Sequence, residues 1–230
     1  MKINVVVVLI MSLMLSSSSV LAFGVVAGGN SSTFEAEYAG EEINTDIDRG
    51  FSWQAGVFND FPVNHNTSIR IGAQFSNRTA TESGDWYYFE FDEYYNLFEI
   101  YGEAKLDYKF SSFTIPIDLI FHPGQSGFFL SAGGVMHFIT SAEQEGEITG
   151  DVYYNGSYQG SASEDFSDDI KDDMKSTEML VCFGGGVEFP MGNNNGFLWV
   201  QYGLGITDFS DITGVDLKSN SINALLGIQF

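Results

Sequence analysis

The stretch LWVQYGLGIT, residues 198–207, decides the fold class because its side chains alternate in character. One set is apolar or aromatic: Leu198, Val200, Tyr202, Leu204 and Ile206. Apart from Trp199, the residues between them are small or polar, as Gln201, Gly203 and Thr207 show. Successive side chains of a β-strand point to opposite faces, so the stretch predicts a strand with one apolar and one mixed face.

The same two-residue period recurs along the chain and predicts an all-β fold. The expected strands are 23–33, 50–61, 67–79, 109–121, 127–140, 177–190, 196–209 and 219–230. Three links between them are short and rich in Pro, Gly or Asn, as turns require, whereas the others, 34–49, 80–108, 141–176 and 210–218, are longer. Alternating short and long links predict an eight-stranded antiparallel up-and-down barrel whose two ends meet different surroundings.

The composition of the two faces favours a transmembrane barrel, with short periplasmic turns and long acidic extracellular loops. The second face carries Arg70, Gln201 and many glycines, which suits a narrow lumen better than contact with bulk water. A closed barrel also pairs every backbone N–H and C=O inside a membrane. A soluble lipocalin-like barrel, with its apolar face turned inward, is the alternative, and it predicts release into the soluble periplasmic fraction.

The first 22 residues read as a secretory signal peptide, so the barrel domain is expected at 23–230. Lys2 precedes the apolar run 5–15, and the small-residue exit ends at Ala22. The single cysteine, Cys182, allows no internal disulfide and is expected to be a buried filler. A formal charge of -22, with 9 Lys and Arg, excludes nucleic acid as a natural partner.

The final strand is expected to face lipid and to close the barrel against the first strand. Its apolar row is formed by Ile222, Leu226, Ile228 and Phe230. Such a row needs no polar tail if it faces lipid rather than water.

Seven segments, in this order, resemble the bacterial outer-membrane β-barrel domain family, the small PorT-like "porin family" barrels. They are FGVVAGGNSSTF (23–34), GFSWQAGVFNDFPV (50–63), SSFTIPIDLIF (111–121), FFLSAGGVMHF (128–138), MLVCFGGGVEFPM (179–191), VQYGLGITDFSD (200–211) and INALLGIQF (222–230). The resemblance implies a monomer in the bacterial outer membrane, in contact with lipid and lipopolysaccharide and inserted by the barrel-assembly machinery. It implies no single activity.

Most of the 31 Asp and Glu residues lie in the four long links, and the short turns contain none. Charge runs of this kind are usually solvated, self-repelling loops. A sharper hypothesis is a Ca²⁺ or Mg²⁺ site in the densest run, DDIKDDMK, although its spacing is not that of an EF-hand. Its ligands would be Asp168, Asp169, Asp172 and Asp173. No other cofactor is expected.

In the lumen we expect a charge network of Arg70, Asp118 and Glu188, because an isolated buried charge is costly. An eight-stranded barrel is just wide enough to be filled by its own side chains, so this network would act as a plug. His65 and His122 fall in short turns and His137 within a strand, without an evident triad, so catalysis is not expected.

The aromatic and acidic segment 85–108 predicts that two strands continue beyond the membrane as a protruding hairpin, with partner binding as its purpose. The function predicted from sequence is a non-catalytic, surface-exposed structural or adhesion-type role, with acidic loops that bind divalent cations or an extracellular protein. Two other hypotheses stay open: porin-like passage of small solutes, and a lipid-modifying outer-membrane enzyme.

Overall fold

The computed structural model describes residues 22–230 apart from 39–40, 43–45, 92–96 and 125. The described chain is almost entirely β-structure, with one short 3₁₀ helix. Its elements are β1 (Ala22–Tyr38), β2 (Glu41–Glu42), β3 (Asp46–Asn64), β4 (Thr67–Phe91), β5 (Leu97–Phe121), β6 (Phe128–Tyr154), β7 (Ser157–Asp169), η1 (Lys171–Asp173), β8 (Thr177–Met191), β9 (Asn194–Gly205) and β10 (Val215–Gln229). Among these residues, no helix is long and apolar enough to cross a membrane.

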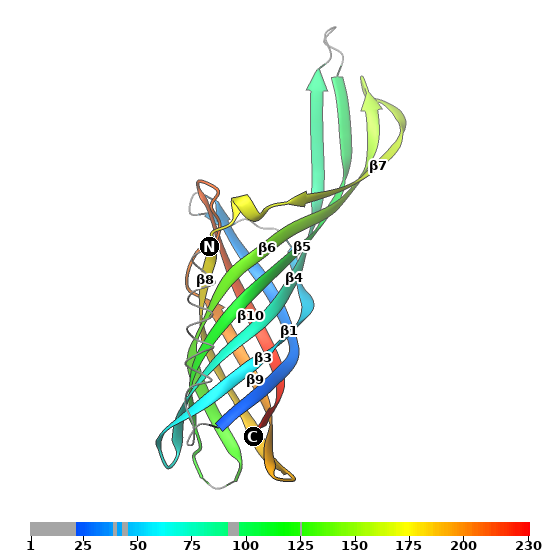
Figure 1. Cartoon of the computed structure of the whole chain (residues 1–230). Helices are drawn as coiled ribbons and strands as arrows, with labels where there is room; N and C mark the ends of the chain where they lie inside the picture. The colour runs from blue at the N-terminus through cyan, green and yellow to red at the C-terminus, as the bar shows by residue number, and fades with distance from the viewer. Residues whose placement is uncertain (1–21, 39–40, 43–45, 92–96, 125) are drawn as a thin grey trace.

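Eight of the described strands close into a ring of antiparallel neighbours (Figure 1). The order around the ring is β10, β9, β8, β6, β5, β4, β3 and β1, and β1 then pairs with β10 from Gly24–Gln229 to Tyr38–Val215. The short strand β2 pairs with β1, and β7 pairs with β6, outside the ring. The predicted eight-stranded, up-and-down barrel is therefore confirmed.

The apolar side chains of the strands face outward, as the alternation predicts. In β9, Leu198, Val200 and Leu204 are 44–50% exposed, whereas Trp199 and Gln201 between them are buried. The hydrogen-bond register fixes which side chains face outward along the whole strand, because a register shift of one residue would turn every apolar side chain inward.

The inner face is filled by alternating large and small residues. A Cβ atom on Gly24 would lie 2.1 Å from the ring of Phe58, and one on Gly227 would lie 2.1 Å from the ring of Phe197. Phe58 and Phe197 themselves meet edge to face with their centroids 5.4 Å apart. The glycines on the inner face therefore make room for aromatic rings from neighbouring strands, which suits a barrel of this width.

The two ends of the barrel differ as the link lengths predict. Short connections join β3 to β4, β5 to β6 and β8 to β9 at the end where β1 begins and β10 finishes, and long connections lie at the opposite end (Figure 1). There β4 and β5 extend far beyond the ring as a paired hairpin, with their ladder running to Phe91–Leu97. The protruding hairpin expected for 85–108 is confirmed.

Most ring strands run further toward the long connections than the sequence predicts, and two departures change the path of the chain there. The third long link is not a loop, since β6 continues to Tyr154 and β7 folds back along it from Ser157 to Asp169. Both faces of this hairpin are rich in polar residues, so its sequence lacks the apolar alternation that marks the ring strands. The strand predicted at 196–209 ends earlier, at Gly205, because the following residues form a connection toward β10.

Candidate functional site: a filled lumen and an aromatic sheet beyond the ring

A buried ion pair fills the lumen near the short connections. Arg70 of β4 donates from Nε and Nη2 to the two carboxylate oxygens of Asp60 of β3, both at 2.8 Å. The guanidinium carbon of Arg70 lies 4.3 Å from the ring centroid of Phe58 and 4.5 Å from that of Phe197. This planar, two-point pairing between aromatic rings is the geometry for which arginine is suited.

A second buried ion pair crosses the lumen toward the long connections. Arg78 of β4 donates from Nη1 to Oε2 of Glu178 of β8 at 2.6 Å and to the hydroxyl of Ser219 of β10 at 2.8 Å. The Ser219 hydroxyl in turn donates to the other oxygen of Glu178. Because β4, β8 and β10 are not neighbours in the ring, this group ties three separate parts of the wall together.

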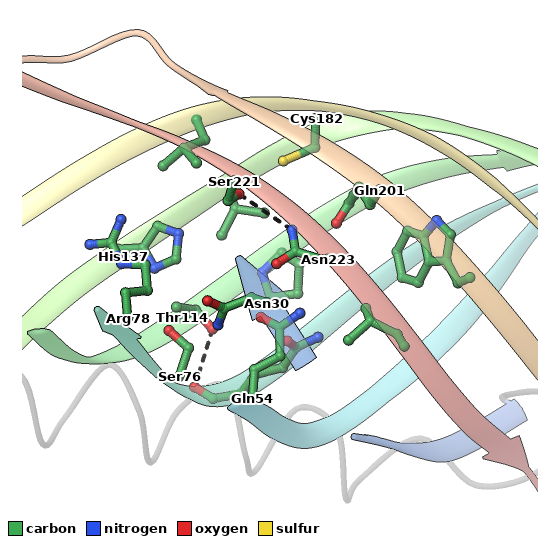
Figure 2. Close-up of a pocket in the computed structure, with 16 residues that line it drawn as sticks. Asn30, Gln54, Ser76, Arg78, Thr114, His137, Cys182, Gln201, Ser221 and Asn223 are labelled. Carbon is green, nitrogen blue, oxygen red and sulfur yellow. Dashed lines mark hydrogen bonds between the residues drawn. The ribbon is translucent and has the colours of Figure 1, made fainter. Parts of the chain in front are cut away.

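Between the two ion pairs, polar side chains from many strands converge on the barrel axis (Figure 2). They surround a cavity of about 20 Å³, enough for about one water molecule. Its lining includes Asn30, Gln54, Gln201 and Asn223. The lumen is thus filled by the protein's own side chains along this section.

The structure brings two of the three predicted network residues together. Arg70 and Asp118 are partners in the β4–β5 register, and Asp118 accepts a hydrogen bond from Gln201 at 2.8 Å. Glu188 lies apart, 3.2 Å from His122 near the short connections. The two-point partner of Arg70, Asp60, was not among the predicted residues.

The lumen also holds a serine and a histidine within contact distance. The hydroxyl of Ser112 lies 3.4 Å from Nδ1 of His137, and both side chains are buried. The acid nearest in register to His137 is Glu178, which is bound to Arg78 and Ser219. The arrangement has the residue types of a triad but is enclosed by the barrel wall.

The residues of the predicted closing strand and those of the predicted cation site lie in different parts of the fold. In β10, Ile222 and Leu226 are exposed on the outer surface and Ile228 is partly exposed, next to the first strand, and Phe230, exposed as well, follows directly after β10. The four aspartates lie at the end of β7 and in η1: Asp168, Asp169, Asp172 and Asp173. Among the described residues, no group of three or more His, Cys, Asp or Glu side chains is arranged to hold a metal ion.

Beyond the ring, β4 to β7 form a four-stranded sheet with a row of tyrosines on one face. Tyr87 and Tyr101 pack with their centroids 4.6 Å apart, Tyr101 and Tyr153 at 5.8 Å, and Tyr153 and Tyr158 at 5.6 Å. Phe89 continues the row at 5.8 Å from Tyr87. We call this set the tyrosine row.

Carboxylates lie among the rings of the tyrosine row. Glu99 accepts hydrogen bonds from the hydroxyls of Tyr87 at 3.1 Å and Tyr101 at 2.9 Å. Hydrogen bonds with Tyr87 and Glu99 raise the pKa of the Tyr101 hydroxyl above its usual value. A shallow hollow beside Tyr101 is lined by Glu103, Asp151 and Ser161. The face therefore combines exposed aromatic rings with negative charge.

A closed ring of antiparallel strands, with an apolar outer belt and a filled polar lumen, defines a transmembrane β-barrel. The chain belongs to the family described as "Outer membrane protein beta-barrel domain", which matches residues 16–211. It is accordingly a protein of the bacterial outer membrane.

Similar solved structures include three small outer-membrane proteins. Ail of Yersinia pestis, in complex with a heparin analogue, is 12% identical, with a TM-score of 0.36 and coverage of 91% of this chain and 99% of Ail. Neisserial surface protein A is 12% identical, with a TM-score of 0.35 and coverage of 92% and 100%. OprG of Pseudomonas aeruginosa is 9% identical, with a TM-score of 0.37 and coverage of 91% and 95%. No curated protein sequence matches the chain.

Proposed function

We propose that this protein is a non-catalytic outer-membrane barrel that uses the tyrosine row to bind a basic segment of an extracellular protein. The observation that carries the proposal is the face itself, where Tyr87, Tyr101 and Tyr158 are 49–57% exposed around carboxylates. Exposed aromatic clusters rimmed by polar residues mark interaction sites. In this proposal the short connections are periplasmic, and residues 1–22 are removed on export, leaving Phe23 as the first residue.

Charge complementarity selects a basic partner. Residues 80–108 and 141–170 contain one basic residue, Lys105, among many acids, and the whole chain has a charge of -22. Arginine and lysine bind aromatic faces by cation–π attraction and pair with carboxylates, so both features of the face recognise the same side chains. An acidic protein or a sulfated polysaccharide would instead be repelled.

The test measures binding of a fluorescent nona-arginine peptide to the full barrel in lipid nanodiscs. We expect Glu99→Gln/Glu103→Gln to weaken binding by about tenfold, and Tyr101→Ser/Tyr158→Ser to weaken it similarly although no formal charge is lost. The control Glu164→Gln/Asp168→Asn removes the same charge from the opposite face of β7, since it alternates with the tyrosine-row face. Equal losses in control and test variants would show that only overall charge matters, and the proposal would fail.

The filled lumen supports a non-conducting role over passage of small solutes. Two buried ion pairs and a cavity of about 20 Å³ occupy the barrel axis. We expect no steady ion conductance when the purified protein is inserted into planar bilayers. A stable open channel in the wild-type protein would instead favour the porin-like hypothesis.

A further inference from the structure

A second site lies at the mouth of the barrel, apart from the tyrosine row. It is a cavity of about 250 Å³, just below the range of about 300–1,000 Å³ typical of small-molecule sites. Its walls come from six ring strands and two connections, and most of its lining is apolar or aromatic. Its lining includes Phe110, Ile170, Met174, Val215 and Leu217, together with the acids Glu82 and Asp173.

The floor of this mouth cavity is a cluster of three phenylalanine rings. Phe34 lies 5.0 Å from Phe110 and 5.8 Å from Phe209, and Phe110 and Phe209 are also 5.8 Å apart. All three rings are at least 95% buried. Arg78 lies beneath them, with its guanidinium carbon 5.9 Å from the centroid of Phe209. The cavity is therefore a closed-ended pocket rather than the entrance of a channel.

One wall is a segment, residues 170–175, that is held in place by backbone hydrogen bonds. Ile170 donates to the carbonyl of Ala142 at 2.9 Å, and Lys175 donates to that of Phe209 at 2.8 Å. A β-bridge joins Met174 to Ser210, within the connection from β9 to β10. The wall is thus anchored on both sides, so the pocket is formed before any ligand enters.

The polar groups of the pocket define the charge of its ligand. Glu82 accepts a hydrogen bond from Tyr108 at 2.8 Å, and a carboxylate has further acceptor sites. Asp173 is a second acid in the lining, and no Lys or Arg is among the described residues that line the cavity. An anionic ligand would find no counter-charge there, whereas an amine would find a carboxylate beside an apolar enclosure.

We infer that the mouth cavity binds a small apolar molecule of about one aromatic ring that carries an amino group, with the ring among Phe110, Ile170 and Leu217 and the amine directed at Glu82. This inference goes beyond the proposed function and does not depend on it. The ligand is received from the side of the long connections, because the phenylalanine floor and the Arg78–Glu178 pair separate the cavity from the lumen.

The test is equilibrium dialysis of three probes against the full protein in nanodiscs, with protein-free nanodiscs subtracting partition into lipid. The probes share a phenyl ring and a short alkyl chain but differ in charge: phenethylamine, phenethyl alcohol and 3-phenylpropionate. We expect saturable binding of one phenethylamine per protein, binding of phenethyl alcohol about tenfold weaker, and no saturable binding of 3-phenylpropionate.

Variants of the lining separate the pocket from non-specific uptake. Glu82→Gln should abolish the preference for amine over alcohol, while Val215→Trp or Met174→Trp should fill the cavity and lower phenethylamine affinity at least tenfold. Two filling variants are used so that a folding defect in one leaves the other informative, and Val63→Trp at the opposite end serves as the control. Absence of saturable phenethylamine binding, equal binding of 3-phenylpropionate, or affinity unchanged in a folded filling variant would overturn the inference.

Discussion

Removing Glu178 from the buried Arg78–Glu178 ion pair should destabilise the barrel more than removing the more exposed Glu188. In Glu178→Ala, Arg78 loses its carboxylate and Ser219 loses its acceptor, while the guanidinium stays in a site that is 2% exposed. Breaking a buried pair by removing one partner costs about 3–5 kcal/mol. We therefore expect the free energy of unfolding to fall by about that amount.

The assay is reversible unfolding by guanidinium chloride from phospholipid vesicles, followed by tryptophan fluorescence. Glu188→Ala is the matched control, because Glu188 also has a basic partner, His122, but both side chains are about one quarter exposed. A pair so open to water contributes less than about 1 kcal/mol. If Glu178→Ala lowered the free energy of unfolding no more than Glu188→Ala, the conclusion that the buried Arg78–Glu178 pair stabilises the barrel would be refuted.

A double replacement distinguishes the value of the pair from the cost of breaking it. Nε and Nη2 of Arg78 are buried without a hydrogen-bond partner, so the pair is incompletely satisfied. Replacing both members by apolar residues of similar size, as in Arg78→Met/Glu178→Leu, is expected to be neutral or stabilising by about 1–4 kcal/mol. A double variant as unstable as Glu178→Ala would mean that the lumen needs charge at this level.

Two further predictions concern the loops and the outer surface. Burial raises the pKa of Asp208, but hydrogen bonds from Lys175 and from the backbone N–H groups of Leu217 and Ser210 outweigh it and hold that pKa below its usual value of 3.8. The stabilisation that Asp208 contributes is therefore fully present above its usual pKa and is lost as the pH falls through its lowered pKa in the folded protein. The difference in unfolding free energy between wild type and Asp208→Asn should be constant above about pH 5 and vanish at lower pH. A difference that grew on acidification would contradict this. On the membrane side, Val200→Arg should cost about 2–4 kcal/mol in vesicles and Val63→Arg, near the short connections, about 0–1 kcal/mol; equal costs would contradict the placement of Val200 in the apolar belt.

The ring strands could be predicted from sequence because each has one face in contact with the surroundings and the other in the lumen. In β9 this difference appears as Val200 beside Gln201, and it repeats at every second residue. The hairpin of β6 and β7 beyond the ring has no such contrast between its faces. Polar residues such as Glu147 and Asp165, which are opposite each other in its ladder, lie in water. The backbone of this hairpin pairs as regularly as the ring strands do, but its side chains lack the alternation from which a strand is predicted.

The partners of the buried arginines show a similar limit. Asp60 could have been found, because it and Arg70 lie opposite each other in neighbouring strands joined by a short turn. Glu178 could not, because it is 100 residues from Arg78 and reaches it across the lumen rather than along the ladder. Pairing along a ladder follows from turn length, whereas pairing across a barrel depends on strand tilt and shear.

The distribution of charge links the filled lumen to the two proposed sites. Inside the barrel, the two buried arginines lie beside the carboxylates of Asp60, Glu178 and Asp118. This placement matters because a buried charge without a partner is costly. Of the basic residues beyond the lumen, Lys109 and Lys175 are already paired with Glu145 and Asp208. The excess of acids consequently lies at the end with the long connections, where its field attracts cations and repels anions over about 8 Å at physiological salt. The same field favours a basic protein at the tyrosine row and an amine at the mouth cavity, but the contacts that would hold them involve different residues. Variants that abolish binding at the tyrosine row should therefore leave amine binding at the mouth cavity intact, and the reverse should also hold.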